Sequence, residues 1–330
     1  MTYHVYGIGN ALVDMEFEVA EAFLQENNIE KGLMTLIDEA QQQQLSKSLD
    51  EAYGITKRTG GGSAANTVVA ISQLGGNAFY ACKVANDEPG AFYMANLAEA
   101  GVTTRLEQMK HEGITGKCMV MVTPDAERTM NSFLGITSDF STEELHFEDL
   151  KQAQYIYVEG YLVTSDISRA AVMEARKVAA ENNVKTALTF SDPSMVTYFR
   201  DGVAEIIGDG VDILFSNEEE ATTFTGKEDL NEVIAELQKF TKTLVLTLGS
   251  KGAMIIKGDE HIEIAPVATT AIDTNGAGDM FAGAYMYGVT HDFSDLQAGN
   301  LASEAASIIV SRFGTRLDTK EQQHLIETYC

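Results

Sequence analysis

The sequence predicts an α/β protein with a mostly parallel sheet, helices on both faces of that sheet, and a second, smaller sheet. From residue 155 onward, apolar strand patterns alternate regularly with helical patterns, as in parallel sheets covered on both faces. Two glycine-rich turns, at 60–66 and 274–279, each stand directly before an apolar helix pattern. Half-polar strands within the first 135 residues are typical of a sheet with one face in water.

The first half of the chain begins with an apolar strand at 3–8 that ends in Gly7-Ile8-Gly9-Asn10. Further elements predicted there are half-polar strands at 16–19 and 33–37, helices at 21–27, 67–74 and 90–100, a strand at 78–84, and strands at 117–122 and 128–133 that form a hairpin. The half-polar strands suggest a small sheet inserted into one core domain, because no repeat or proline-rich linker divides the chain.

The second half repeats one pattern, in which a buried strand is followed by an amphipathic helix. Strands are predicted at 155–158, 186–190, 211–215 and 243–248, helices at 168–181 and 230–240, a hairpin at 253–257 and 261–264, and closing helices at 280–288, 296–310 and 320–328. Connections of this kind place the strands parallel to one another.

Composition narrows the possible partners. With 23 basic and 49 acidic residues the net charge is −26, which argues against nucleic acid because phosphate binding needs Lys and Arg. The three cysteines are widely spaced, without a Cys-x-x-Cys pair, so reduced thiols and a cytoplasmic location are expected. No signal-peptide pattern or apolar run of membrane-spanning length is present.

The stretch from 271 to 284 carries the strongest chemical signal. The backbone amides of Gly276, Ala277 and Gly278 fall at the start of a helix, where unpaired N–H groups and the helix dipole bind anions. Asp279 follows directly, and a carboxylate beside an anion site suggests a proton acceptor. A tight turn with a capping aspartate is the alternative interpretation of this stretch taken alone.

Other candidate residues give a weaker indication of a functional site when each is taken alone. Asn10 and Asp14 follow the first strand, where open α/β sheets bind ligands. No stretch matches the P-loop spacing, and the six histidines are scattered without metal-ligand spacing. Lys117 and Arg128 are interpreted as surface charges, with contact between Arg128 and a phosphate or carboxylate as the less favoured alternative.

Together the motifs resemble those of the ribokinase-like (PfkB) carbohydrate and nucleoside kinases. The stretches that carry the resemblance are Gly61-Gly62-Ser63-Ala64-Ala65-Asn66 through Gly76, Asn217-x-x-Glu220, Thr247-Leu248-Gly249-Ser250-Lys251-Gly252, and Asp273 through Gly283. The resemblance implies a three-layer α/β/α core with a small β-sheet lid. It also implies one kinase domain over 1–330, with lid strands at about 14–60 and 111–135.

The resemblance also assigns roles to individual residues. Asp279 would be the base that takes the proton from the acceptor hydroxyl, and the amides of Gly276, Ala277 and Gly278 would hold the transferring phosphate. Substrate hydroxyls would be bound by Asn10, Asp14, Gly62, Ser63 and Asn66. The ATP side would be formed by Asn217, Thr247, Gly249, Gly252 and Thr274. Glu220 would hold Mg²⁺ through water, and Asp273 resembles a residue of a monovalent-cation loop, so K⁺ is a possible further cofactor.

The sequence favours one class of phosphate acceptor but leaves alternatives open. The segment Gly7-Ile8-Gly9-Asn10-Ala11-Leu12-Val13-Asp14 resembles the start of adenosine kinases, whereas Ala64-Ala65 departs from the Thr-Gln that animal adenosine kinases carry. A purine nucleoside kinase acting on adenosine is therefore the first choice. A ribose or fructose kinase is the alternative, and a non-catalytic ligand sensor is less favoured. A monomer and a homodimer both remain open.

Overall fold

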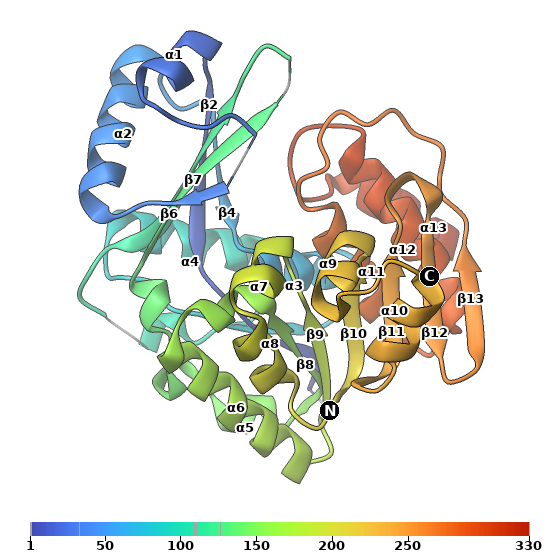
Figure 1. The fold of residues 1–330 in the computed structure, drawn as a ribbon. Coiled ribbons are helices and arrows are strands. Elements are labelled where there is room, and N and C mark those ends of the chain that lie inside the picture. Colours follow the sequence, from blue (N-terminus) through green and yellow to red (C-terminus); the bar gives the residue numbers. More distant parts are fainter. Residues whose placement is uncertain (1, 33, 109–110, 126, 330) are drawn as a thin grey trace.

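The computed structural model describes residues 2–32, 34–108, 111–125 and 127–329. Over these residues the chain forms an eight-stranded sheet and a five-stranded sheet (Figure 1). The large sheet has the order β13-β12-β11-β10-β9-β8-β1-β5. Its strands are β1 (Tyr3–Ile8), β5 (Ala78–Ala81), β8 (Ala153–Glu159), β9 (Lys185–Thr189), β10 (Val211–Asn217), β11 (Thr241–Thr247), β12 (Ala253–Lys257) and β13 (Glu260–Ile264). Pairing is parallel from β5 to β11, and only β12 and β13 join antiparallel at one edge.

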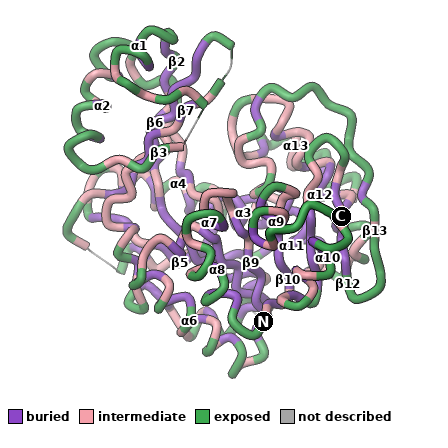
Figure 2. The backbone as a smooth tube through the Cα atoms, viewed as in Figure 1, coloured by how far each residue is buried: buried purple, intermediate pink, exposed green. Residues whose placement is uncertain are grey.

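Helices cover both faces of the large sheet. One apolar cluster joins the sheet to α3 (Ser63–Gln73), α11 (Ala277–Thr290) and α12 (Asp295–Val310). A second cluster joins the opposite face to α6 (Asp166–Glu181), α8 (Arg200–Ile207), α9 (Glu218–Thr225) and α10 (Leu230–Leu237). Further helices of this part of the molecule are α4 (Glu88–Glu99), α5 (Phe147–Leu150), α7 (Pro193–Tyr198) and α13 (Thr319–Tyr329). Figure 2 shows most strands of the large sheet as the buried centre of the molecule, whereas the edge strand β13 is largely exposed.

The small sheet stands over one end of the large sheet and has the order β3-β7-β6-β2-β4. Its strands are β2 (Leu12–Glu18), β3 (Met34–Leu36), β4 (Lys57–Gly61), β6 (Thr115–Val122) and β7 (Arg128–Gly135). Side chains alternate along these strands, so Val13, Met15 and Phe17 are buried on the outer face while Leu12 and Asp14 line a pocket on the inner face. The outer face packs in one cluster with residues of α1 (Glu21–Glu26) and α2 (Glu39–Ala52).

The structure confirms the predicted fold class and the strands predicted in the second half. Elements without a predicted range are α2, β4, α5, α7, α8 and α9. The glycine turn proposed at 60–66 is in fact the end of β4 joined to the start of α3, which begins four residues earlier than the predicted helix. The strand predicted at 33–37 corresponds to β3, and Leu33 lies outside the described residues.

Within the described ranges, every helix is too short or too polar to cross a membrane. Cys82 and Cys118 are free and buried, and Cys330 falls outside the described residues.

Candidate active site

A pocket of about 410 Å³ lies between the large sheet and the inner face of the small sheet. Its floor is built by residues at or just beyond the carboxyl ends of five strands, namely Asn10, Glu159, Thr189, Asn217 and Thr247. Its roof is formed by inward side chains of the small sheet. Open α/β sheets bind ligands at this end of their strands, and here the small sheet encloses the space.

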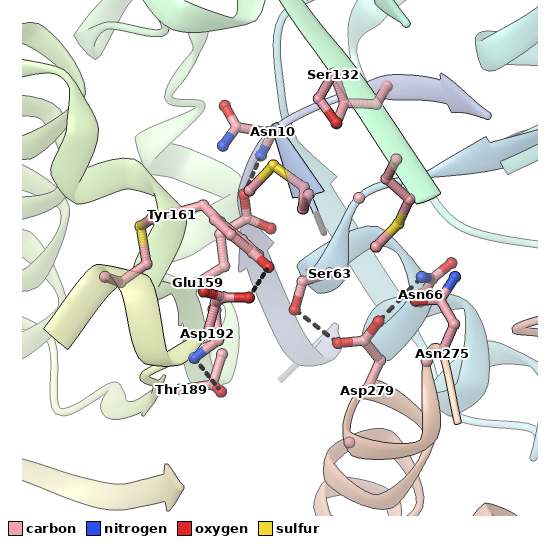
Figure 3. Close-up of a pocket in the computed structure, with 18 of the residues that line it drawn as sticks. Asn10, Ser63, Asn66, Ser132, Glu159, Tyr161, Thr189, Asp192, Asn275 and Asp279 are labelled. Carbon is pink, nitrogen blue, oxygen red and sulfur yellow. Dashed lines mark hydrogen bonds between the residues drawn. The ribbon is translucent and has the colours of Figure 1, made fainter. Parts of the chain in front are cut away.

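Asp279 lies in the first turn of α11 and faces the pocket (Figure 3). Ser63 Oγ donates to its Oδ1 at 2.6 Å, and Asn66 Nδ2 donates to its Oδ2 at 3.0 Å. Thr315 Oγ1 in turn donates to Asn66 Oδ1 at 3.1 Å, which fixes the orientation of the amide. Burial raises the pKa of Asp279 to about 6, although the two hydrogen bonds oppose this rise. The two hydrogen bonds therefore hold the carboxylate in place, and the balance between them and burial sets its pKa as a proton acceptor.

The loop before α11 has the shape of an anion site, with one difference from the prediction. Gly276 has a φ of +75°, and a Cβ there would lie 2.6 Å from the Thr315 side chain, so the turn requires glycine. A Cβ built on Gly278 would meet nothing within 4 Å, so space lies open at the first turn. The Ala277 amide, however, donates to Thr274 O at 3.2 Å. Ala277 therefore does not offer its amide to a ligand in this structure, and Gly276 and Gly278 remain as donors.

The second glycine turn brings the first strand and α3 together. Gly62 has a φ of +106°, and a Cβ there would lie 2.3 Å from Asn10 O. Beneath the turn, the fully buried Glu159 accepts from Asn10 N at 2.7 Å and from Ala64 N at 2.8 Å. Burial raises its pKa to about 7 against these two donors. This carboxyl group thus fixes the relative position of the two turns that carry Asn10 and Ser63.

Asp14 projects from β2 into the same pocket as Ser63 and Asn66. Burial raises its pKa to about 7, although the nearby guanidinium groups of Arg316 and Arg128 stabilise the charged form. The structure therefore brings together the five predicted substrate-binding residues Asn10, Asp14, Gly62, Ser63 and Asn66.

Of the residues predicted for the nucleotide and magnesium, four lie at the pocket. Asn217, Thr247, Thr274 and Glu220 line the pocket. Asn217 and Glu220 also form a capping box at the start of α9, with Asn217 N and Nδ2 donating to the Glu220 carboxylate at 3.0 and 2.9 Å. Burial raises the pKa of Glu220 to about 7.

Gly249 and Gly252, predicted on the nucleotide side, do not line this pocket. They close the turn from β11 to β12, where Leu248 N donates to Gly252 O at 2.8 Å and Gly252 N donates to Gly249 O at 3.1 Å. The positive φ values of both glycines, +59° and +95°, are accounted for by this turn.

Arg128 was interpreted as a surface charge, and that interpretation is wrong, whereas the less favoured alternative, contact with a carboxylate, is confirmed. Its side chain is 10% exposed; Nη2 donates to Glu16 Oε2 at 3.0 Å and lies 3.1 Å from Asp273 Oδ2. Asp273, predicted as a possible cation ligand, is thus buried beside an arginine. The sequence did not reveal this contact because 145 residues separate the two, as 273 − 128 gives.

Several pocket residues were not singled out from the sequence for a role in the site. Glu159 directly follows a strand that was predicted, so its place at a carboxyl strand end was the available signal. Asp192 was not singled out either, and its Oδ2 lies 3.5 Å from the Oη of Tyr161 (Figure 3). Tyr161 itself was considered from the sequence as an aromatic partner for a purine, with a place in the core as the favoured interpretation, and it lines the pocket. The apolar inner wall of the small sheet consists of Leu12, Met34, Leu36, Val120, Met130 and Leu134.

Comparison with known proteins agrees with this geometry. Residues 33–322 match the model of the pfkB family carbohydrate kinases. The adenosine kinase of Saccharomyces cerevisiae is 27% identical over 88% of this chain and 89% of its own. The crystal structure of adenosine kinase from Sinorhizobium meliloti is 31% identical, with a TM-score of 0.90 over 99% of this chain and all of its own. A probable sugar kinase from Rhizobium etli is 29% identical, with a TM-score of 0.91 over 99% of this chain and 98% of its own.

The two structural matches extend over both sheets, and the family match covers the chain from residue 33, which includes both glycine-rich motifs. The chain therefore belongs to the PfkB family of carbohydrate kinases, enzymes that phosphorylate hydroxyl groups.

Proposed function

We propose that this protein transfers the γ-phosphoryl group of ATP to a hydroxyl group of a nucleoside, with adenosine as the first choice and AMP as the product. The observation that carries the proposal is the placement of Asp279. Its carboxylate is held by Ser63 and Asn66 at the start of α11, inside a pocket that the small sheet lines mostly with apolar side chains.

In the proposed reaction the acceptor hydroxyl gives its proton to Asp279 as its oxygen bonds to the γ-phosphorus. The bond from that phosphorus to the bridging oxygen of ATP breaks, and ADP leaves with the electron pair. The amides of Gly276 and Gly278, at the positive end of the α11 dipole, stabilise the charge on the transferring group. Ser63 and Asn66 hold the base while the small sheet, acting as a lid, excludes water.

The residues at the start of α9 fit a magnesium ion bound through water. Each oxygen of Glu220 accepts one hydrogen bond from Asn217, which fixes the orientation of the carboxylate. The remaining lone pairs of these oxygens can accept from water, and Mg²⁺ retains several waters in proteins. When bound there, Mg²⁺ would neutralise phosphate charge, and Asn217 and Glu220 would orient its waters.

The choice of acceptor rests on the two ends of the pocket. Asn10, Asp14 and the Gly62 turn supply polar groups suited to sugar hydroxyls. Beyond them, most of the small-sheet side chains that line the pocket are leucine, methionine and valine, with Cys118 and Ser132 among them. A free sugar carries hydroxyl groups on every side, so some of them would face the apolar side chains of the small sheet without hydrogen-bond partners. A flat nucleoside base would instead bury these apolar side chains. A ribose or fructose kinase is the second candidate, favoured by the polar end alone.

The remaining parts of the proposal concern the setting of the enzyme. One ribokinase-like domain spans 1–330, with the lid strands inserted at about 14–60 and 111–135, and the enzyme serves purine salvage in the cytoplasm. The buried free thiols of Cys82 and Cys118 are compatible with a reducing compartment. A potassium requirement is not part of the proposal, because Asp273 is paired with Arg128.

Steady-state assays with Mg-ATP and a panel of nucleosides and sugars test the proposal. Adenosine should have the highest kcat/KM. Turnover of ribose or fructose without turnover of adenosine would favour the second candidate, and no turnover with any acceptor would favour a ligand sensor. In Asp279→Asn most turnover should be lost while ATP binding, measured by calorimetry, is retained. Near-normal kcat in that variant would show that Asp279 is not the base.

A further inference from the structure

Arg128 connects the small sheet to the loop that precedes α11. It is the first residue of β7, and its Nη2 donates to Glu16 on β2 of the same sheet. The same nitrogen lies 3.1 Å from Asp273 Oδ2, and the guanidinium carbon lies 5.4 Å from the centre of the Phe313 ring. One side chain thus contacts the small sheet and two segments that adjoin the anion site.

Asp273 in turn shapes the loop that carries the anion site. Its Oδ1 accepts from Asn275 N at 3.1 Å, and its own amide lies 3.2 Å from Val310 O, to which it donates. The side chain is 4% exposed. In the described part of the chain, Oδ2 has no hydrogen-bond donor. The charge of this carboxylate is therefore compensated chiefly by the ion pair with Arg128, because burying an unpaired carboxylate is costly.

The residues at this position do not fit a monovalent metal ion. A cation bound to Asp273 Oδ2 would stand next to the guanidinium group, and two like charges at such a distance repel each other. The positive charge that a metal would supply is already supplied by the chain.

We propose that Arg128 takes the place of a monovalent cation at Asp273, so that the small sheet itself fixes the glycine-rich loop and turnover needs no K⁺. Arg128 is then a positioning residue that acts through Asp273. This inference rests on the proposed kinase reaction for its kinetic consequences, but its ion-binding consequence can be measured without turnover.

The first test measures binding of K⁺ to the wild-type protein. An ion that binds only the native state raises the melting temperature. We expect equal melting temperatures in KCl and in tetramethylammonium chloride at the same ionic strength. A rise specific to K⁺ would show a cation site and overturn the proposal, and this result does not depend on whether the protein is a kinase.

The second test removes the guanidinium group by mutation and then adds guanidinium ion to the assay buffer as a replacement. Arg128→Ala should lower kcat by up to about a hundredfold through misplacement of the loop, with a smaller change in KM. Low concentrations of guanidinium, but not of urea, should restore part of kcat. A folded variant that keeps wild-type kcat, or that responds equally to urea, would contradict the proposal.

Arg58 provides the matched control. It belongs to β4 of the same sheet, pairs with a carboxylate, Glu88, at 2.7 Å, and lies 4.2 Å from the centre of the Phe92 ring. Neither partner is part of the loop, so Arg58→Ala should keep its turnover and show no guanidinium response.

A double-mutant cycle with Asp273→Asn separates positioning through Asp273 from a general structural effect. If Arg128 acts through Asp273, the double variant should lose little more kcat than the more damaged single variant. Fully additive losses would show that Arg128 acts by another route and would overturn the assignment. If the wild-type protein proves inactive with every acceptor, the proposed function fails, whereas the melting-temperature test still decides between an arginine and a metal at Asp273.

Discussion

At Asp279, burial and hydrogen bonding act in opposite directions on one carboxyl group. Burial dominates and raises the pKa to about 6. A base must be deprotonated to accept a proton, so the rate should be constant above this pKa and fall below it. We expect kcat/KM to lose about tenfold for each pH unit below about 6. Measurements of kcat/KM across this range with saturating Mg-ATP will check the prediction, and a rate that stays level well below pH 6 would contradict it.

The hydrogen bond from Ser63 gives a second expectation at the same carboxylate. Ser63 Oγ donates to Asp279 Oδ1 at 2.6 Å and lowers the pKa of Asp279. In Ser63→Ala the charged form loses this donor, so the pKa should rise and the acidic limb of the rate profile should move to higher pH. Ser48→Ala, on the exposed face of α2, is the control and should leave the limb unchanged. A limb that stays in place in Ser63→Ala would mean that the hydrogen bond does not tune the base.

At the scale of elements, the junction between β1 and α3 depends on one close backbone contact. Gly62 has a positive φ, and a Cβ would lie 2.3 Å from Asn10 O, whereas Gly54 has a φ of +74° with nothing within 4 Å of a Cβ. Gly54→Ala should therefore cost only about 1–2 kcal/mol of backbone strain. Gly62→Ala adds a clash and should cost about 1–3 kcal/mol more. It should also lower turnover, because Asn10 and Ser63 move.

Urea unfolding of the two alanine variants measures this difference. Equal losses in free energy of unfolding would show that positive φ alone explains the need for glycine at position 62. Unchanged kcat in Gly62→Ala would show that the contact with Asn10 is not needed to position the site.

Elements with strong internal periodicity could be predicted from the sequence, and those that depend on distant contacts could not. The strands β8 to β11 are apolar runs bounded by turns, which identifies buried parallel strands. Helix α2 was missed because its mean composition is polar; only Gln42, Leu45 and Leu49 are buried, against the small sheet. Strand β4, Lys-Arg-Thr-Gly-Gly, is a strand only because β2 pairs with it.

The same distinction applies to the site. The two glycine-rich motifs could be found from the sequence because each carries its own local pattern, and in the structure residues of both line one pocket. The ion pair between Arg128 and Asp273 joins residues far apart in the chain, and nothing near either residue indicates its partner. The engagement of the Ala277 amide by Thr274 is likewise a property of the folded loop.

At the scale of the whole molecule, the small sheet has two faces with different neighbours. Its inner face closes the pocket, and its outer face packs in one apolar cluster with residues of α1 and α2. The side of α2 that faces solvent carries Gln, Glu, Ser and Lys residues, and Figure 2 shows that side as largely exposed. A stable dimer interface has an apolar centre with few charges. Neither face of the small sheet therefore offers a surface of the kind that a second copy would need.

The net charge adds a second argument against self-association, because two chains of −26 each repel one another at low ionic strength. We therefore expect a monomer, which is one of the two states that the sequence left open. Size-exclusion chromatography with light scattering should give the mass of one chain at all protein concentrations tested. The mass should not change when salt screens the repulsion, because the outer face of the small sheet is already covered. A dimer that appears only at high salt would show that charge alone keeps the copies apart. A dimer at low salt would place the interface on a surface other than the small sheet, and substitutions in α2 should then leave it intact.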